Sequence, residues 1–85
     1  MDYKVELTRT AEKQLKKIHK LAKDRLVRKI RTLAIEPYPD GVRKLSGYDD
    51  VFRVRVGDYR VIYSVFEDRV MILVLKIGHR KDVYR

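Results

Sequence analysis

Hydrophobic and polar residues alternate most regularly between Val51 and Tyr63, and this pattern predicts a β-hairpin. A two-residue Gly57-Asp58 loop suits a type II′ turn, because glycine readily adopts the positive φ of the first central position. The turn fixes the register of the two strands. It pairs Val56 with Tyr59, Arg55 with Arg60 and Val54 with Val61.

The predicted hairpin has one apolar face and one basic face. The apolar face would carry Phe52, Val54, Val56, Tyr59, Val61 and Tyr63. Three arginines, Arg53, Arg55 and Arg60, share the other face. Like charges directly opposite each other destabilise a sheet, so this arrangement predicts that an anion binds there. Phosphate is the natural candidate, because the guanidinium group binds it through two parallel hydrogen bonds.

A structural explanation for the same arginines is that each pairs with a carboxylate. The carboxylates nearest to the hairpin in the sequence are Asp49, Asp50 and Asp58. They would have to be placed correctly to neutralise the basic face, and we consider an anion site the better interpretation.

The N-terminal half predicts a short strand over residues 3–7 and two amphipathic helices. Apolar residues recur at helical spacing, first at Ala11, Leu15 and Ile18 and then at Leu26, Ile30, Leu33 and Ala34. Thr8 or Thr10 can cap the first helix. The shift of the apolar stripe places a break near His19 to Lys23, although one bent helix is an alternative. Pro37 is expected to end the second helix.

The C-terminal half adds strands to the sheet. Residues 42–45 predict a second strand, and residues 70–77 predict a central strand that is apolar on both faces. Lys76 favours a register in which Met71, Leu73, Leu75 and Ile77 face the core. The element order βααββββ predicts an α+β fold: an antiparallel sheet with a helical hairpin on one face and the other face at least partly open.

Composition limits the class of protein. A chain of 85 residues makes a single domain over residues 1–85 with one small core. It has no cysteine and no long apolar run, so we expect a cytoplasmic protein without disulfides and without membrane contact. The net charge of +9 favours a polyanionic partner.

Most of this charge lies on the predicted helices. Between Lys13 and Arg31 there are nine basic residues and one acidic residue, Asp24. Lysines on exposed helical positions are often no more than a solvated surface. The alternative is docking to nucleic-acid phosphates. The candidate RNA-binding or ribosome-binding residues are Lys13, Lys16, Lys17, Lys20, Lys23, Arg28 and Arg31.

The C-terminal tail brings further candidates for chemistry. His79, Arg80 and Tyr84 follow the last strand, and Arg80 and Tyr84 could join the arginines if the tail folds over the sheet. A frayed end is the simpler alternative. His19 and His79 are far apart, and no carboxylate cluster has ligand spacing, so no metal site is predicted. No phosphate loop or dinucleotide motif is present, and we expect no cofactor.

Four segments together make the chain similar to a known family. They are residues 8–15 after the opening strand, residues 43–47, the hairpin at residues 52–63 and the tail at residues 78–84. In this order and spacing they resemble the RelE/ParE superfamily of toxin–antitoxin toxins over essentially the whole chain. The resemblance implies a microbial-ribonuclease-like fold and a cognate, RelB-like antitoxin, for which we expect an acidic segment.

The resemblance also implies an activity. RelE-like members cut mRNA on the ribosome, whereas ParE-like members poison DNA gyrase and lack the nuclease residues. The positions that carry the RelE-like reaction are filled here by Arg53, Arg55, Arg60, Arg80 and Tyr84. This favours a ribosome-dependent endoribonuclease that needs no metal, with a gyrase inhibitor as the alternative.

One departure concerns proton transfer. The first two of these positions are often lysine in RelE-like nucleases, and arginine is a poor proton acceptor because it stays charged at any working pH. His79 is then the best available proton-transfer group, because imidazole exchanges protons near neutral pH.

Overall fold

The computed structural model describes residues 2–80 of the chain. These residues form a strand, two helices and four further strands, in the predicted order, with a short 3-10 turn (η1) before the last strand. The elements are β1 Lys4–Leu7, α1 Arg9–Lys16, α2 Lys20–Leu33, β2 Arg43–Lys44, β3 Val51–Val56, β4 Tyr59–Phe66, η1 Glu67–Arg69 and β5 Met71–His79.

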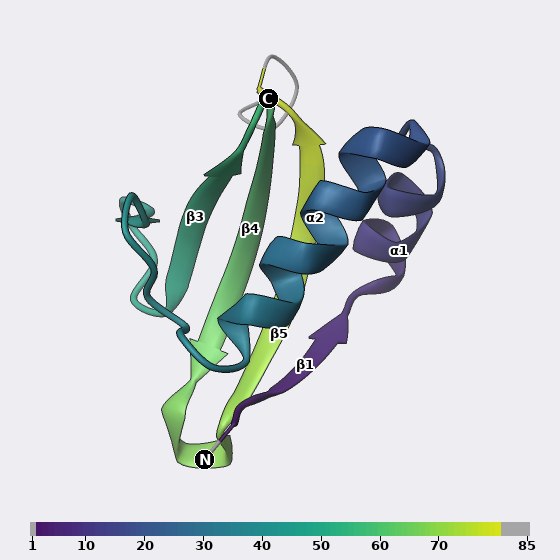
Figure 1. The fold of residues 1–85 in the computed structure, drawn as a ribbon. Coiled ribbons are helices and arrows are strands. Elements are labelled where there is room, and N and C mark those ends of the chain that lie inside the picture. Colours follow the sequence, from purple (N-terminus) through teal and green to yellow (C-terminus); the bar gives the residue numbers. More distant parts are fainter. Residues whose placement is uncertain (1, 81–85) are drawn as a thin grey trace.

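The strands form one sheet in the order β1-β5-β4-β3-β2. Neighbouring strands are antiparallel except β1 and β5, which run parallel. α1 and α2 cover one face of this sheet (Figure 1). The structure therefore confirms the α+β fold and the order βααββββ. The parallel edge pair was not predicted; everything between β1 and β5 serves as the long crossover that a parallel pair requires.

The core lies between the helices and the face of the sheet that they cover. The helices contribute Ala11, Leu26, Ile30 and Leu33, and the sheet contributes Val54, Val61, Tyr63, Val65, Ile72, Val74 and Ile77. Tyr63 is fully buried, and its hydroxyl donates to the Pro37 carbonyl oxygen at 2.7 Å. Burial raises the pKa of Tyr63 well above its usual value. The largest buried side chain of the core is thus also hydrogen-bonded to the loop after α2.

Local sequence explains where the helices begin and end. Thr8 caps α1, because its Oγ1 accepts a hydrogen bond from the Ala11 amide at 3.1 Å. The same hydroxyl donates to the Leu75 carbonyl oxygen at 2.9 Å and so ties the start of α1 to β5. The two-helix interpretation is confirmed, but the break lies at residues 17–19, mostly before the predicted place, since α2 already begins at Lys20. α2 ends at Leu33, before the predicted stop at Pro37.

The hairpin has the predicted register. Val56 pairs with Tyr59, Arg55 with Arg60 and Val54 with Val61. Gly57 has a φ of +60° and Asp58 does not share the positive φ, as a type II′ turn requires. β2 is shorter than the predicted strand over residues 42–45.

The predicted register of β5 is wrong in its first half. Ile72 and Val74 face the core, in place of Met71 and Leu73, while Ile77 faces the core as predicted. The register shifts between Ile62 and Tyr63 of β4, which pair with Lys76 and Val74. Leu75 is the extra residue of a β-bulge, which changes the face to which later side chains point.

The helices of the described residues do not reach across a bilayer. α2 is the longest at 14 residues, and none of the helices within residues 2–80 is long and apolar enough to span a membrane.

Candidate phosphate-binding site

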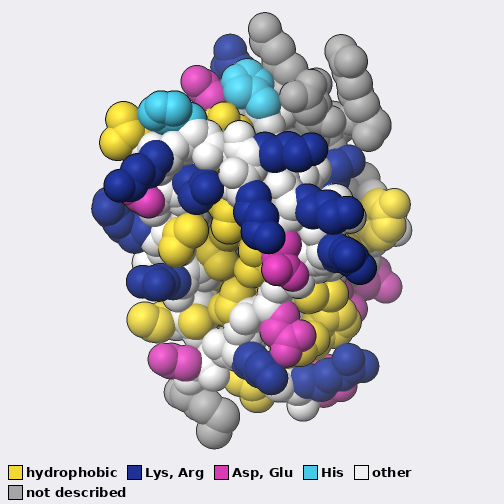
Figure 2. Space-filling view, turned by 90° about the vertical axis from the view of Figure 1, so that its right-hand side faces the viewer, with side chains coloured by type: hydrophobic (Ala, Val, Ile, Leu, Met, Phe, Trp, Pro, Cys, Tyr) yellow, Lys and Arg dark blue, Asp and Glu magenta, His cyan; other side chains and the backbone are white. Residues whose placement is uncertain are grey.

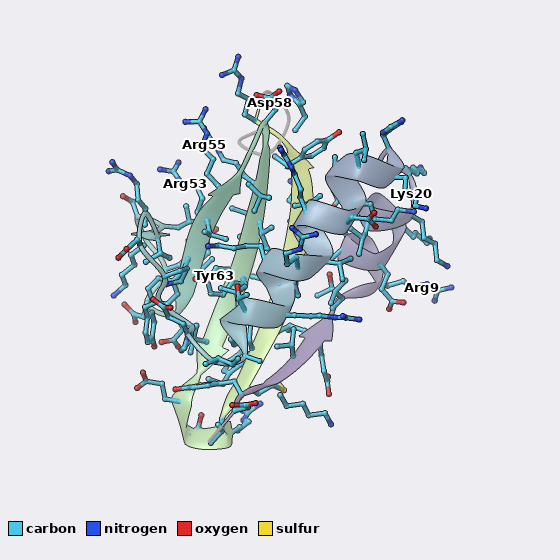
Figure 3. All side chains as sticks on the ribbon, viewed as in Figure 1. Arg9, Lys20, Arg53, Arg55, Asp58 and Tyr63 are labelled. Atoms are coloured by element: carbon cyan, nitrogen blue, oxygen red, sulfur yellow. The ribbon has the colours of Figure 1, made fainter. Side chains whose placement is uncertain are left out.

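Three arginines lie on the face of the sheet away from α1 and α2, which we call the arginine face. Arg53 and Arg55 come from β3 and Arg60 comes from β4. Their register partners place all three on the same face, opposite to core residues Val54 and Val61. Figure 3 shows Arg53 and Arg55 projecting from β3 away from α2. This part of the predicted site is therefore assembled as the alternation indicated.

Arg80 joins this cluster at the end of β5. Its backbone amide donates to the Asp58 carbonyl oxygen at 2.8 Å, which holds the start of the tail beside the hairpin turn. The pKa of Arg60 is lowered, first by burial and then by the positive charges of Arg53, Arg55 and Arg80. Four cationic side chains are therefore close enough to repel one another. An anion bound among them would relieve that repulsion.

The backbone near the turn orients one of these side chains. Arg55 Nε donates to the Gly57 carbonyl oxygen at 3.2 Å. Within residues 2–80, no carboxylate lies within salt-bridge distance of Arg55, and the ion pairs Lys4–Glu6 and Arg69–Asp68 lie on β1 and η1. For Arg55, the structure does not support the alternative in which a nearby aspartate neutralises the guanidinium.

Two further cations on the arginine face were missed by sequence reasoning. Arg43 of β2 pairs with Arg53, and Lys76 of β5 pairs with Ile62, the other partner of Arg53. Arg43 is exposed and Lys76 is half-buried. A strand of two residues has no measurable alternation, so the direction of Arg43 could not be predicted. Lys76 faces away from the core as predicted, but nothing in the sequence grouped it with the arginines.

His79 belongs to the other side of the sheet. It pairs with Tyr59, and the two rings meet edge to face with centroids 5.7 Å apart. Tyr59 packs against the hydrophobic core on the helix side. The structure thus separates the His79 ring from the arginine face, while its neighbour Arg80 lies within electrostatic range of Arg60. Tyr84 lies outside the described residues.

The predicted RNA-binding residues of the helices form a second basic surface. Lys13, Lys16, Lys17, Lys20, Arg28 and Arg31 are exposed, and Lys23 is half-buried, with its Nζ donating to the Lys16 carbonyl oxygen at 3.3 Å. Figure 3 shows Lys20 on the helix side, away from Arg53 and Arg55. Seen from the β1 edge, lysine and arginine side chains spread over the upper part of the molecule (Figure 2).

A cleft of about 550 Å³ lies between α2 and the hairpin turn, on the helix side. Its lining includes Arg25, Arg28 and Tyr59 but none of the residues of the arginine face. The arginines therefore line a surface of the sheet and not this cleft. An extended surface suits a polymeric anion better than a small molecule enclosed by protein.

Metal ligation has no support from side-chain placement. Within residues 2–80, no three histidine, aspartate or glutamate side chains are grouped closely enough to hold a metal ion. The positive charge that the arginine face offers comes from its own side chains.

Comparison with known proteins assigns the chain to a family. The model of the ParE toxin of the type II toxin–antitoxin system parDE matches residues 5–84. Toxin RelG of Mycobacterium tuberculosis is 33% identical over all of this chain and 99% of its own length. The mRNA interferase toxin RelE of Escherichia coli is 25% identical, covering 99% of this chain and 92% of its own length.

A solved structure agrees with this assignment. The archaeal RelE–RelB complex from Pyrococcus horikoshii contains a chain that matches with a TM-score of 0.84 and 35% identity, covering 98% of this chain and all of that one. Both the family model and the relatives span nearly the whole sequence. The chain therefore belongs to the RelE/ParE superfamily and is a RelE-like toxin of a type II toxin–antitoxin system.

Proposed function

We propose that this toxin is a ribosome-dependent endoribonuclease that cleaves mRNA. The observation that carries the proposal is the convergence of four arginines on one surface of the sheet: Arg53 and Arg55 from β3, Arg60 from β4, and Arg80 directly after β5. A relative of similar length is named an mRNA interferase. Binding to a protein partner does not call for four cations that repel one another. Stabilising a phosphate that gains negative charge in the transition state does call for such a cluster.

The proposed reaction is a transfer of the phosphoryl group within the RNA. The ribose 2′-oxygen attacks the adjacent phosphorus, a P–O2′ bond forms, and the P–O5′ bond breaks. The 2′-hydroxyl proton passes to a base, and the departing 5′-oxygen takes a proton from an acid. The products are a 2′,3′-cyclic phosphate and a free 5′-hydroxyl, and no metal ion takes part in the proposed step.

Each arginine has a role that follows from its position. Arg60, with Arg53 and Arg55 beside it, would stabilise the charge that develops on the pentacoordinate phosphorus. One well-aimed donor contributes about 3 kcal/mol to such a transition state. Arg80, at the end of β5, would stabilise the departing 5′-oxygen. All four roles are electrostatic, and arginine suits them because it remains charged throughout the reaction.

Proton transfer is the step with two candidates. His79 has suitable chemistry, but its ring packs against Tyr59 on the helix side of the sheet. Tyr84 occupies the position of the tyrosine that the family resemblance makes part of the reaction, where it would orient or stack on the substrate. The pH dependence of the cleavage rate distinguishes the two.

The helix side would supply the dependence on the ribosome. The basic residues of α1, α2 and the turn between them lie on the helix side of the sheet, opposite the arginine face. They are Lys13, Lys16, Lys17, Lys20, Lys23, Arg28 and Arg31. A protein that enters a site walled by ribosomal RNA can contact that RNA with one side and the mRNA with the other. The ribosome would then hold the substrate in the geometry that the reaction requires.

A cognate antitoxin is the expected protein partner. The solved Pyrococcus horikoshii relative is titled a RelE–RelB complex. For this chain, with a net charge of +9, we propose a RelB-like antitoxin with an acidic segment that covers a basic surface. Complex formation should lower nonspecific RNA affinity together with toxicity. An inhibited complex that binds free RNA with an unchanged salt dependence would contradict this.

A gyrase inhibitor is the alternative, because the family model that matches is named for the ParE toxin. Such a function would rest on binding to a protein and would need no cluster of cations around a phosphate. It would make the substitution of Arg60 by methionine harmless to the activity, provided that the fold is kept.

The deciding experiment adds the purified toxin to a translation extract and maps new 3′ ends by primer extension. Breaks at ribosome-occupied codons, absent with Arg60→Met and present with the control Arg9→Met, would support the nuclease. Arg9 is exposed on α1, far from the arginine face (Figure 3). Intact mRNA together with inhibited DNA supercoiling by purified gyrase would instead establish the alternative.

A further inference from the structure

The arginine face carries more cations than one phosphate can use. Cross-strand partners in a sheet point to the same face, so the register places Arg43, Arg53, Ile62 and Lys76 in one row across β2, β3, β4 and β5. The next row toward the hairpin turn holds Arg55, Arg60 and Gly78. The cluster around Arg60 is therefore flanked by a basic side chain on either side.

Geometry separates the two flanking cations. Neighbouring strands lie about 4.8 Å apart, so the Cα atoms of Arg43 and Lys76 are about 14 Å apart across the row. Arg53 and Ile62 lie between them in this row, and Arg60 lies one row closer to the hairpin turn. Arg43 and Lys76 thus sit at opposite ends of the cluster, where each would meet a different part of an extended anion.

Burial supports an outward direction for these charges. Ile62 is only 7% exposed, although it lies on the face that the helices do not cover. Its two neighbours in the row, Arg53 and Lys76, are both half-buried. Long basic side chains commonly lay their aliphatic stems over apolar residues and keep the charged head in water. This packing would hold the Arg53 and Lys76 head groups above Ile62.

The rest of this face offers no cation along the strands. Away from the hairpin turn, the next row holds Val51, Ser64 and Leu73, which carry no charge. A polyanion that followed the strands would leave the basic side chains after Arg53. A polyanion that crossed the strands, from β2 to β5, would meet only basic and apolar side chains in the row of Arg53.

We propose that Arg43 and Lys76 bind the backbone phosphates on either side of the scissile one, so that single-stranded RNA crosses the sheet from β2 to β5. This inference rests on the proposed nuclease function and adds two positioning residues to it. The flanking contacts fix the register of the backbone and leave the central phosphate to Arg53, Arg55, Arg60 and Arg80. They do not read sequence, because phosphate contacts carry no information about the base.

Binding of RNA that cannot be cleaved tests the proposal separately from catalysis. The ligands are a hexanucleotide with 2′-O-methyl riboses, which block the attacking hydroxyl, and a dinucleotide with a single phosphate. Each is titrated into the wild type, Arg43→Gln and Lys76→Gln over a range of salt concentrations. Arg9→Gln and Lys29→Gln serve as controls of the same charge change outside the arginine face.

The expected result is a smaller salt dependence for the hexanucleotide only. Each lost phosphate contact lowers the slope of log K against log salt by about 0.7 for a single strand. Arg43→Gln and Lys76→Gln should each show this loss, and the double variant about twice as much. The dinucleotide should bind all variants alike, because its one phosphate occupies the central position.

Two outcomes would overturn the proposal: equal slopes in the site variants and the controls, or equal losses for the dinucleotide and the hexanucleotide. The first would show that only the overall charge matters, and the second would place Arg43 and Lys76 at the central phosphate. Failure of the proposed function is a different result. A wild-type protein that binds the hexanucleotide with the predicted slopes but cuts no mRNA in the translation extract would retain the RNA path and lose the nuclease.

Discussion

Arg55 of β3 lies directly opposite Arg60 of β4, on the face of the sheet away from the helices. Such a pair costs stability in the free protein, because two like charges face each other across neighbouring strands. Arg53 and Arg80 add to the repulsion, and all three lower the pKa of Arg60. The pair is therefore better explained by what it binds than by what it contributes to folding.

Replacing Arg60 by methionine should separate activity from stability. Methionine keeps an apolar stem and removes the charge. We expect the cleavage rate on ribosomes to fall by about 10²- to 10³-fold, as for the loss of one donor to a transition state. The melting temperature should stay the same or rise, since like-charge repulsion is removed. A loss of cooperative melting together with activity would show that Arg60 is structural.

Inorganic phosphate should stabilise the free protein. A ligand that binds only the folded state at ten times its Kd adds about 1.4 kcal/mol, which is a shift of several degrees for a domain of this size. Thermal melts in phosphate and in chloride of equal ionic strength measure the difference. Arg60→Met should lose the extra stabilisation, and Arg9→Met should keep it. Equal stabilisation of both variants would place the anion elsewhere.

The pH dependence of cleavage should decide the role of His79. If His79 transfers a proton, the pH profile of the rate on ribosomes should show a bend that depends on this residue. His79→Gln should then remove the bend and lower the rate by about 10²-fold or more. If the packing against Tyr59 is its role, the variant should keep the parent rate and pH profile. Proton transfer would then fall to Tyr84 or to a ribosomal group.

Tyr63 should make the free energy of unfolding depend on pH in the alkaline range. Its raised pKa means that the unfolded chain loses the phenolic proton first, near the ordinary value of 10.0. The stabilisation is complete below pH 10 and is lost as the pH rises from there toward the folded-state pKa. Tyr63→Phe, which leaves the Pro37 carbonyl oxygen without this donor, should cost about 1–2 kcal/mol at pH 7.

Urea unfolding at pH 7, 9 and 10.5 measures this effect. The difference between the wild type and Tyr63→Phe should be constant up to pH 9 and smaller at pH 10.5. Tyr48→Phe is the matched control, because Tyr48 is 61% exposed. A difference that does not change with pH would mean that folding does not raise the pKa of Tyr63.

The hairpin could be predicted in detail because one short turn controls it. Gly57 restricts the loop to two residues, and the register of Arg55 with Arg60 then follows without further information. The two helices could also be predicted from the sequence, since their apolar residues recur at helical spacing over several turns. These elements depend on interactions between residues close in the sequence.

The parts that escaped prediction depend on contacts between distant residues. Arg43 lies on β2, a strand of two residues, and its place beside Arg53 depends on the pairing of β2 with β3. The parallel pairing of β1 with β5 is similarly remote in the sequence. His79 was chosen as the proton-transfer group for the chemistry of its imidazole, whereas pairing places it opposite Tyr59.

The bulge at Leu75 divides β5 into two halves, in which the alternation of side chains between the two faces of the sheet is shifted by one residue. Before it, Ile72 and Val74 are fixed by the core; after it, Lys76 and Gly78 lie in the rows of the arginine face. The two halves can therefore accept different substitutions, but the number of residues between Val74 and Arg80 cannot change by one without moving every later side chain to the opposite face. A relative with one residue more or fewer in this stretch would have to build its phosphate site from different positions.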